Sequence, residues 1–448
     1  MHKIIAAIAA ASITTTAAAD DWITTWYASP QPTWGAEFAL PTNVPAVLEG
    51  QTVREVVRTS AGGTRLRVSF SNRYGSEPLI IGESRIARTV PTAAAHMPAS
   101  VATAARASTA TPTASRSTLT NGMAAGAATA ADGATSAVDV GSAAMLTFGG
   151  HRSVTIAPGQ TATSDALDFV LPPLQRLTIS TWLPQRAPTT TFHWGTWQTG
   201  YIASGNATAA ANLDGAQLLQ GRAFLSAVEV TGGDTRQHRT VVAFGDSLTD
   251  GNGSTPDQNR RWPDYLAGRL AQQGIGVANA GIAGARLLGD KMGVKAADRF
   301  QHDVLDQPGV DTVIVLIGIN DIGWPGSAFA PQDAPATAEQ LIAAYRQLIT
   351  RAHAANVRII GATLPPYEGS LQGTPFEGHH TPAKDAVRRQ VNEWIRHSGA
   401  FDTVADFDAA LRDPAHSTRL LPAYDCGDHL HPSDAGYAAM AEVVQKVL

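Results

Sequence analysis

Val241-Val242-Ala243-Phe244-Gly245-Asp246-Ser247-Leu248-Thr249-Asp250 is the stretch that decides the fold of this 448-residue chain. Its apolar run ends abruptly at Gly245, and an acidic residue and a serine follow. This pattern is typical of a buried parallel strand that stops at the carboxyl edge of a sheet, where open α/β folds bind their ligands. A serine at such a turn either caps the following helix or exposes its hydroxyl beside free N–H groups. The rest of the chain has to decide between these two roles.

Strand and helix patterns alternate over residues 236–448. Continuous apolar runs at 241–244, 312–317 and 357–362 predict strands that are covered on both faces. Helices are predicted from Trp262-Pro263, from a capping box that pairs Thr337 with Gln340, and over residues 382–396 and 434–447. The prediction for this region is a doubly wound parallel sheet with right-handed crossovers.

Residues 20–235 have short strand patterns without helices between them. Residues 64–71 alternate strictly and place Leu66, Val68 and Phe70 on one face, and further strands are predicted near 79–81, 153–156, 167–171, 177–183 and 224–230. This favours a β-sandwich or jelly-roll-like accessory domain. Residues 91–141 consist largely of Ala, Thr, Ser and Gly, which favours a low-complexity surface loop over an alanine-rich helix.

The N-terminus resembles a secretion signal. Lys3 is followed by an apolar stretch over residues 4–13 that is too short to span a bilayer, and Ala17-Ala18-Ala19 fits a cleavage site. We therefore expect residues 1–19 to be a signal peptide cleaved after Ala19, and the protein to be secreted or periplasmic without a membrane span. The net charge of −5, without a long basic run, argues against nucleic-acid binding.

Four segments of the second region carry polar residues where apolar strands end. Because parallel strands end on one edge of the sheet, these segments can meet. They are Gly245-Asp246-Ser247-Leu248, Asn279-Ala280-Gly281-Ile282-Ala283-Gly284, Gly318-Ile319-Asn320-Asp321 and Asp428-His429-Leu430-His431.

These residue types fit acyl transfer. A serine hydroxyl is a weak nucleophile unless an imidazole takes its proton, and a carboxylate fixes the tautomer of that imidazole. Asp428 and His431 are three residues apart, so on a turn the carboxylate can reach one ring nitrogen while the other faces Ser247. The backbone N–H groups of Ser247 and Gly284 and the amide of Asn320 would form the oxyanion hole.

In their order and residues, the four segments resemble the blocks of the GDSL/SGNH hydrolase family over residues 240–448. The resemblance implies a flavodoxin-like sheet and serine-dependent hydrolysis of carboxylic esters without a metal or other cofactor. Ala283 stands where relatives often carry serine. The β-rich front half is similar to that of larger secreted relatives, but it contains no matching catalytic block.

Other interpretations of single residues stay open. His429, His431 and Asp428, with His379 or His380, could bind a metal, although His429 is more simply a support for its loop and His379-His380 would line the entrance or be solvated. Cys426, the only cysteine, is interpreted as a small buried group. Asp246 and Asp321 are interpreted as capping or loop-organising carboxylates. Six of the nine tryptophans lie in the front half and fit either a sugar platform or a core: Trp22, Trp26, Trp34, Trp182, Trp194 and Trp197.

The sequence therefore predicts a secreted two-domain serine esterase that acts on a small-molecule or glycan ester, most simply an acylated extracellular carbohydrate. A lipase, lysophospholipase or arylesterase, and an O-acyltransferase that uses the same residues, are alternatives within the same chemistry. The non-enzymatic alternative is a glycan-binding surface protein with an inert hydrolase half. The sequence does not determine the substrate-binding residues or the oligomeric state.

Overall fold

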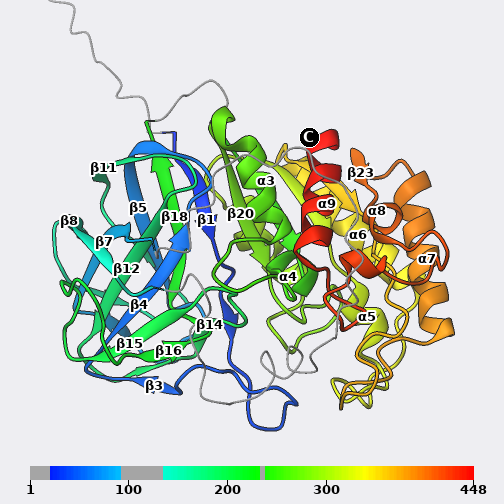
Figure 1. Ribbon diagram of the computed structural model, residues 1–448, viewed down its shortest axis with the longest axis horizontal. Coiled ribbons are helices and arrows are strands. Elements are labelled where there is room, and N and C mark those ends of the chain that lie inside the picture. The colour runs from blue at the N-terminus through cyan, green and yellow to red at the C-terminus, as the bar shows by residue number, and fades with distance from the viewer. Residues whose placement is uncertain (1–20, 92–134, 233–237) are drawn as a thin grey trace, which may run out of the picture.

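A computed structural model describes residues 21–91, 135–232 and 238–448 of the chain. Antiparallel sheets occupy the first two ranges, and a parallel sheet with helices occupies the third (Figure 1). The predicted signal peptide lies outside the described residues. None of the helices in the described ranges is long and apolar enough to cross a membrane.

Two larger antiparallel sheets make up most of the β-rich region. The first contains β1 (Ile23–Tyr27), β18 (Leu225–Thr231), β5 (Gly63–Ser71), β10 (Thr161–Thr163) and β11 (Leu167–Leu171). The second has the order β16 (Gln217–Leu219), β15 (Gly200–Ser204), β4 (Gln51–Arg58), β12 (Arg176–Leu183), β7 (Glu83–Thr89) and β8 (Val138–Met145). The smaller pairings join β13 (Ala187–Pro188) to β3 (Val47–Leu48), β6 (Leu79–Ile81) to β9 (Val154–Ile156), and β14 (Thr191–His193) to β17 (Arg222–Ala223) and β2 (Gln31–Pro32).

Both larger sheets contribute to one apolar core. The predicted inward face of β5 is confirmed, because Leu66, Val68 and Phe70 are buried. They belong to the same cluster as Val53 of β4 and Ile179 of β12. A β-rich front half is therefore confirmed, whereas its jelly-roll connectivity stays a prediction.

The predicted loop at 91–141 ends earlier than expected. Residues 92–134 lie outside the described residues, but Val138 already pairs with Thr89 as β8 begins. The loop prediction was wrong for residues 138–141. Small residues reveal little about a strand whose outer face is exposed, because they lack the alternation that identifies one.

The parallel sheet has the order β20 (Ile275–Gly281), β19 (Arg239–Gly245), β21 (Val310–Leu316), β22 (Arg358–Ala362) and β23 (Thr403–Ala405). Every pairing in it is parallel. In chain order this is 2-1-3-4-5, the flavodoxin-like arrangement. The predicted parallel sheet is confirmed, and β23 is an additional short strand at its edge.

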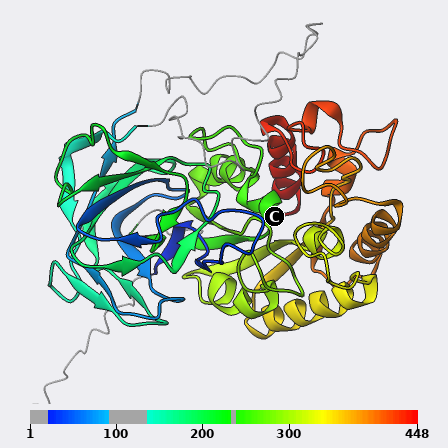
Figure 2. The same cartoon turned by 90° about the horizontal axis from the view of Figure 1, so that it is seen from below.

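Helices cover both faces of this sheet (Figure 2). The longer ones are α3 (Trp262–Leu270), α6 (Ala338–Ala354), α7 (Pro382–His397) and α9 (Asp434–Val447). The shorter helical segments are α2 (Ser247–Asp250), η3 (Ala271–Gln273), α4 (Ala296–Phe300), η4 (Gln301–Leu305), α5 (Ile319–Gly323), α8 (Phe407–Leu411) and η5 (Pro422–Tyr424). As predicted, Thr337 and Gln340 form the capping box of α6, and Pro263 lies in the first turn of α3.

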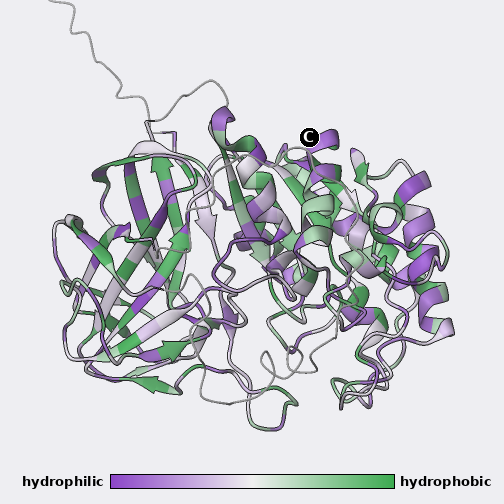
Figure 3. Ribbon diagram, viewed as in Figure 1, coloured by the Kyte–Doolittle hydropathy of each residue, from purple (hydrophilic) through white to green (hydrophobic). Residues whose placement is uncertain are grey.

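The two regions pack directly against each other. Tyr27, Phe192 and Trp194 of the β-rich region belong to the same apolar cluster as the strands of the parallel sheet. Strand β1 runs beside β20, and Ala28 forms a bridge with Asn279 (Figure 1). In Figure 3 the strands of the parallel sheet are largely apolar, whereas the outer helix α7 is strongly polar. The interface is therefore part of the core that supports the sheet.

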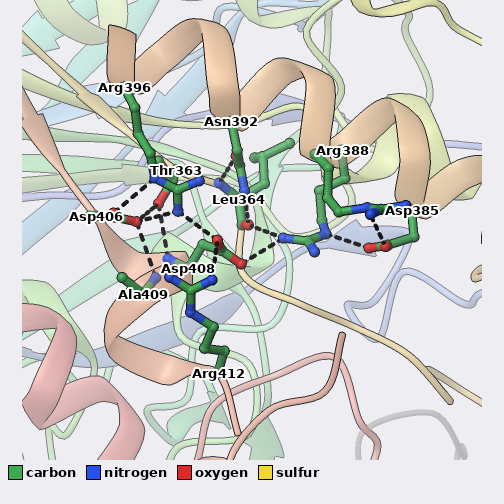
Figure 4. Close-up of polar contacts among 11 residues, drawn as sticks. Thr363, Leu364, Asp385, Arg388, Asn392, Arg396, Asp406, Asp408, Ala409 and Arg412 are labelled. Atoms are coloured by element: carbon green, nitrogen blue, oxygen red, sulfur yellow. Dashed lines mark hydrogen bonds and ion pairs between the residues drawn. The ribbon is translucent and has the colours of Figure 1, made fainter. Parts of the chain in front are cut away.

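A buried charge network fixes α7 to the carboxyl side of β22 (Figure 4). The Arg388 guanidinium donates to Asp385 at 2.8 Å, to Asp408 at 2.7 Å and to the Leu364 carbonyl at 3.0 Å. Arg388 is only 1% exposed. Because buried charges are costly unless they are paired, this network fixes the position of α7 only while all its members are present.

We expect Arg388→Ala to destabilise the protein by about 3 kcal/mol, since it leaves buried carboxylates without their main partner. The neighbouring Arg389, whose side chain is 65% exposed, also contacts Asp385 and provides the control. Arg389→Ala should cost less than about 1 kcal/mol. Urea-induced unfolding followed by circular dichroism measures both changes. Equal urea midpoints of unfolding for the two variants would show that the Arg388 network does not stabilise the protein.

Candidate active site

Ser247 lies where β19 ends and α2 begins. Asp246 is the N-cap of α2, and its carboxylate accepts a hydrogen bond from the Leu248 N–H at 3.0 Å. The preceding Gly245 has to be glycine, because a Cβ there would lie 2.4 Å from the Leu316 carbonyl oxygen. This close approach allows the chain to turn sharply and places the Ser247 hydroxyl at the carboxyl edge of the sheet.

The loop before α9 brings a carboxylate and an imidazole to the same place. His431 Nε2 lies 2.9 Å from Ser247 Oγ, and His431 Nδ1 lies 2.5 Å from Asp428 Oδ2. The other oxygen of Asp428 accepts from the N–H groups of Leu430 and His431 at 2.9 and 2.8 Å. The carboxylate is therefore held by its own loop, and the imidazole ring is fixed between carboxylate and hydroxyl.

The two ionisable groups shift each other's pKa in opposite directions. Burial by itself lowers the pKa of His431, but the charge and hydrogen bond of Asp428 outweigh it, so the pKa is raised. Burial by itself raises the pKa of Asp428, but His431 and two backbone N–H groups lower it overall. At neutral pH the carboxylate is ionised. The imidazole is therefore made more basic and better able to take a proton from Ser247.

Gly284 and Asn320 follow the two strands on either side of β19: Gly284 lies in the loop after β20, and Asn320 lies in α5 after β21. Gly284 has φ +72°, and a Cβ there would meet the Met292 sulfur at 2.4 Å. The Asn320 side chain donates to the Ala285 carbonyl at 3.1 Å, which ties it to the Gly284 loop. Within the described ranges, the backbone N–H groups of Ser247 and Gly284 have no hydrogen-bond acceptor. Both are free to bind an anion.

Asp321 organises the Gly284 loop, as expected from the sequence. Its two carboxylate oxygens accept from the N–H groups of Leu287 and Leu288 at 2.7 and 2.8 Å. Burial raises the pKa of Asp321 to about 6, although these two bonds oppose the shift. Burial likewise raises the pKa of Asp246 to about 7.

The model of the GDSL-like Lipase/Acylhydrolase family matches residues 241–444, which contain all of these segments. The α/β region belongs to this family. It is therefore an ester hydrolase. A comparison with curated proteins gave no match.

Several solved structures are similar to this acylhydrolase region. One is a putative lipolytic protein of the G-D-S-L family from Desulfitobacterium hafniense, with 24% identity and a TM-score of 0.35 over 47% of this chain and 99% of that one. Another is a putative arylesterase from Agrobacterium tumefaciens, with 21% identity and a TM-score of 0.36 over 47% and 100% of the two chains. A third, the carbohydrate acetylesterase Est24 from Sinorhizobium meliloti, has 16% identity and a TM-score of 0.36 over 47% and 98%.

Of the histidines outside the Ser247 site, His379 differs from the expectation and His429 agrees with it. His379 was predicted at the entrance or in solvent, but it is 1% exposed and packs against Gly323. Burial lowers its pKa to about 3. His380 is half-buried. His429 does support its loop, because its Nδ1 lies 2.5 Å from Asp425.

The residues considered as metal ligands do not come together as proposed. Both ring nitrogens of His431 face Ser247 and Asp428, and His429 faces Asp425 instead. In the described part of the chain, the ligand atoms close enough to share an ion belong to Asp425, Cys426 and Asp428. Cys426 is half-buried, and burial raises the pKa of its thiol, which makes it a poor nucleophile.

The front-half tryptophans divide into two groups. Trp26 and Trp194 are 6% exposed and belong to the core. Trp22, Trp34, Trp182 and Trp197 are half-buried. The core interpretation therefore holds for Trp26 and Trp194, and a sugar platform stays a prediction for the other four.

Two residues that touch the site were not singled out from the sequence. Asp250 accepts from the Ala283 N–H at 3.2 Å, next to Gly284, and lies 3.1 Å from His193 Nε2. Asp250 ends the motif around Ser247, which is a signal that could have identified it. His193 lies 57 residues earlier, on strand β14 of the β-rich region, and no local pattern points to it.

We expect Asp428→Asn to lower the pKa of His431 by roughly one unit or more, because the loss of the carboxylate charge leaves burial as the dominant effect. NMR titration of the histidine Cε1–H signals measures this shift. Asp425→Asn is the matched control, since Asp425 pairs with His429 and has only a minor effect on His431. An unchanged His431 pKa in Asp428→Asn would show that Asp428 does not raise it.

Proposed function

We propose that this acylhydrolase is a serine esterase in which Ser247 attacks the ester carbonyl. The observation that carries the proposal is the continuous hydrogen-bonded line from Asp428 through His431 to Ser247 Oγ. A hydroxyl in this position loses its proton to the imidazole as it attacks, and the carboxylate stabilises the imidazolium that forms.

The oxyanion would be held by the N–H groups of Ser247 and Gly284 and by the amide of Asn320. His431 then gives its proton to the leaving alcohol, and an acyl group remains on Ser247. A water molecule activated by the same imidazole releases the acid and restores the serine. Each oxyanion donor in such a site contributes a factor of roughly 10²–10³ in kcat.

For the substrate, we propose an acylated extracellular carbohydrate, reached after export through a cleaved signal at residues 1–19. The half-buried tryptophans Trp22, Trp34, Trp182 and Trp197 support this choice, because aromatic faces pack well against sugar rings. The proposed oxyanion donors would bind the carbonyl oxygen of the ester and would not contact its alcohol group. The alcohol must therefore be identified by comparing substrates.

Ser247→Ala is expected to lower ester hydrolysis by about a thousandfold or more, since the nucleophile is lost while the backbone N–H remains. Release of p-nitrophenol from esters of rising chain length measures the loss. Ser254→Ala is the matched control, because this buried hydroxyl in the same loop donates only to the Gly251 carbonyl. It should keep activity within a few-fold of wild type.

Acetylated xylan and a lysophospholipid, tested beside the aryl esters, separate the possible alcohols. Free-acid release compared with acyl-sugar formation separates hydrolysis from acyl transfer. A chelator should leave the activity unchanged. Activity that survives in Ser247→Ala but is lost with the chelator would replace the serine mechanism with a metal-dependent one.

A further inference from the structure

A short segment of the β-rich region, residues 193–199, holds the loop that follows Ser247. His193 Nε2 lies 3.1 Å from Asp250 Oδ1, and the Trp197 indole N–H donates to Asn252 at 3.1 Å. Farther along, the N–H and hydroxyl of Thr199 both donate to Asp257 at 2.7 Å. We call this set of contacts the 193–199 clasp.

The first contact of the clasp continues to the oxyanion loop. The second oxygen of Asp250 accepts from the Ala283 N–H at 3.2 Å, and the next residue is Gly284. The Asn279 amide also donates to the Thr249 carbonyl at 3.0 Å. His193 is therefore joined through one carboxylate to the peptide that precedes the Gly284 N–H.

His193 has a hydrogen-bond partner at each ring nitrogen. Its Nδ1 lies 2.9 Å from the Ser29 carbonyl oxygen, and its Nε2 faces the Asp250 carboxylate. Both contacts lie within hydrogen-bond distance, so the ring is fixed in one orientation between its two partners. Arg222 and Arg261 line the same small cavity as His193 and Asp250. His193 and Asp250 are 4% and 1% exposed, so their contact is shielded from water.

A buried hydrogen bond holds its geometry tightly, because any separation leaves buried polar groups without partners. Asp250 must therefore stay close to His193, and the Ala283 N–H must stay close to Asp250. An oxyanion donor is effective only when it points at the position of the developing charge, and a displacement of about 1 Å can cost a factor of about 100 in rate.

We propose that His193 is a positioning residue for ester hydrolysis, which acts through Asp250 to hold the Gly284 N–H in the oxyanion hole. The β-rich region thereby completes the active site of the acylhydrolase region, besides any part it takes in binding substrate. This inference rests on the proposed function of Ser247 and Gly284.

The test compares wild type, His193→Phe, His193→Gln and Thr24→Val in the full chain. His193→Phe keeps a ring but removes both hydrogen bonds. We expect kcat for p-nitrophenyl acetate to fall about 10- to 100-fold, which is less than the fall caused by removing one oxyanion donor completely. KM should change less than about threefold, because the ground-state ester makes little use of that donor. His193→Gln keeps one donor and should recover part of kcat.

Thr24→Val is the matched control for a lost bond between the two regions. The buried Thr24 hydroxyl donates to Gln307 at 3.0 Å, at the opposite end of the parallel strands from Ser247. Thr24→Val should lower the midpoint of thermal unfolding by about as much as His193→Gln does, but it should leave kcat unchanged. If His193→Phe does not fold, His193→Gln compared with Thr24→Val decides the question.

Affinity for phenylboronic acid gives a second measurement, since the acid adds to the serine hydroxyl and presents a tetrahedral anion to the oxyanion hole. Its inhibition constant should rise in His193→Gln by about the factor by which kcat falls. Unchanged kcat and inhibition constant in the His193 variants, with only a lowered midpoint, would overturn the inference. Full activity in Ser247→Ala would instead overturn the proposed function itself.

Discussion

The site depends on the parallel register of β19 between β20 and β21. Gly245 pairs with Gly281 on one side and with Leu316 on the other, so three strands end at the same level. The loops that follow carry Ser247, Gly284 and Asn320. A slip of the register would move one loop along the sheet by a residue or more and separate these groups. The buried apolar side chains of all three strands prevent such a slip.

A buried arginine reinforces the same strand ends. Arg299 is fully buried, and its guanidinium donates to the Gly245 carbonyl at 2.7 Å and to the Ala280 carbonyl at 2.8 Å. Its charge is balanced by Asp303 at 2.7 Å, and Asp303 in turn accepts from the Tyr27 hydroxyl at 2.7 Å. An unpaired charge at this depth would cost several kcal/mol. The pairing instead makes the end of β19 rigid, and through Tyr27 of β1 it connects this end to the β-rich region.

The parallel sheet and the meeting of Ser247 with His431 could be predicted because both follow from local patterns. Long apolar runs identify covered strands, and a spacing of three residues lets Asp428 reach His431 within one turn. Strand β23 was missed because three residues, two of them only partly buried, form no recognisable pattern. The burial of His379 was missed because a histidine pair beside a glycine and a threonine looks polar, and its packing against Gly323 and Tyr367 is not visible in the sequence. His193 and Asp250 were missed because their contact joins strand β14 of the β-rich region to helix α2 of the other region.

The β-rich region contacts the parallel sheet through apolar packing and through hydrogen bonds, and the two have different roles. On strand β14, side chains alternate, so that Phe192 and the following Trp194 pack into the core of the parallel sheet while His193 points to Ser29 and Asp250. Burying one large aromatic side chain stabilises the packing by roughly 4–6 kcal/mol, from 150–250 Å² at 25 cal/mol per Å². A hydrogen bond to a charged group contributes only about 1.5–3 kcal/mol. Apolar packing therefore holds the regions together, whereas the directional His193–Asp250 contact determines where the oxyanion loop lies. Loss of the aromatic packing would separate the regions, but loss of the polar contact would leave them joined with the oxyanion loop misplaced.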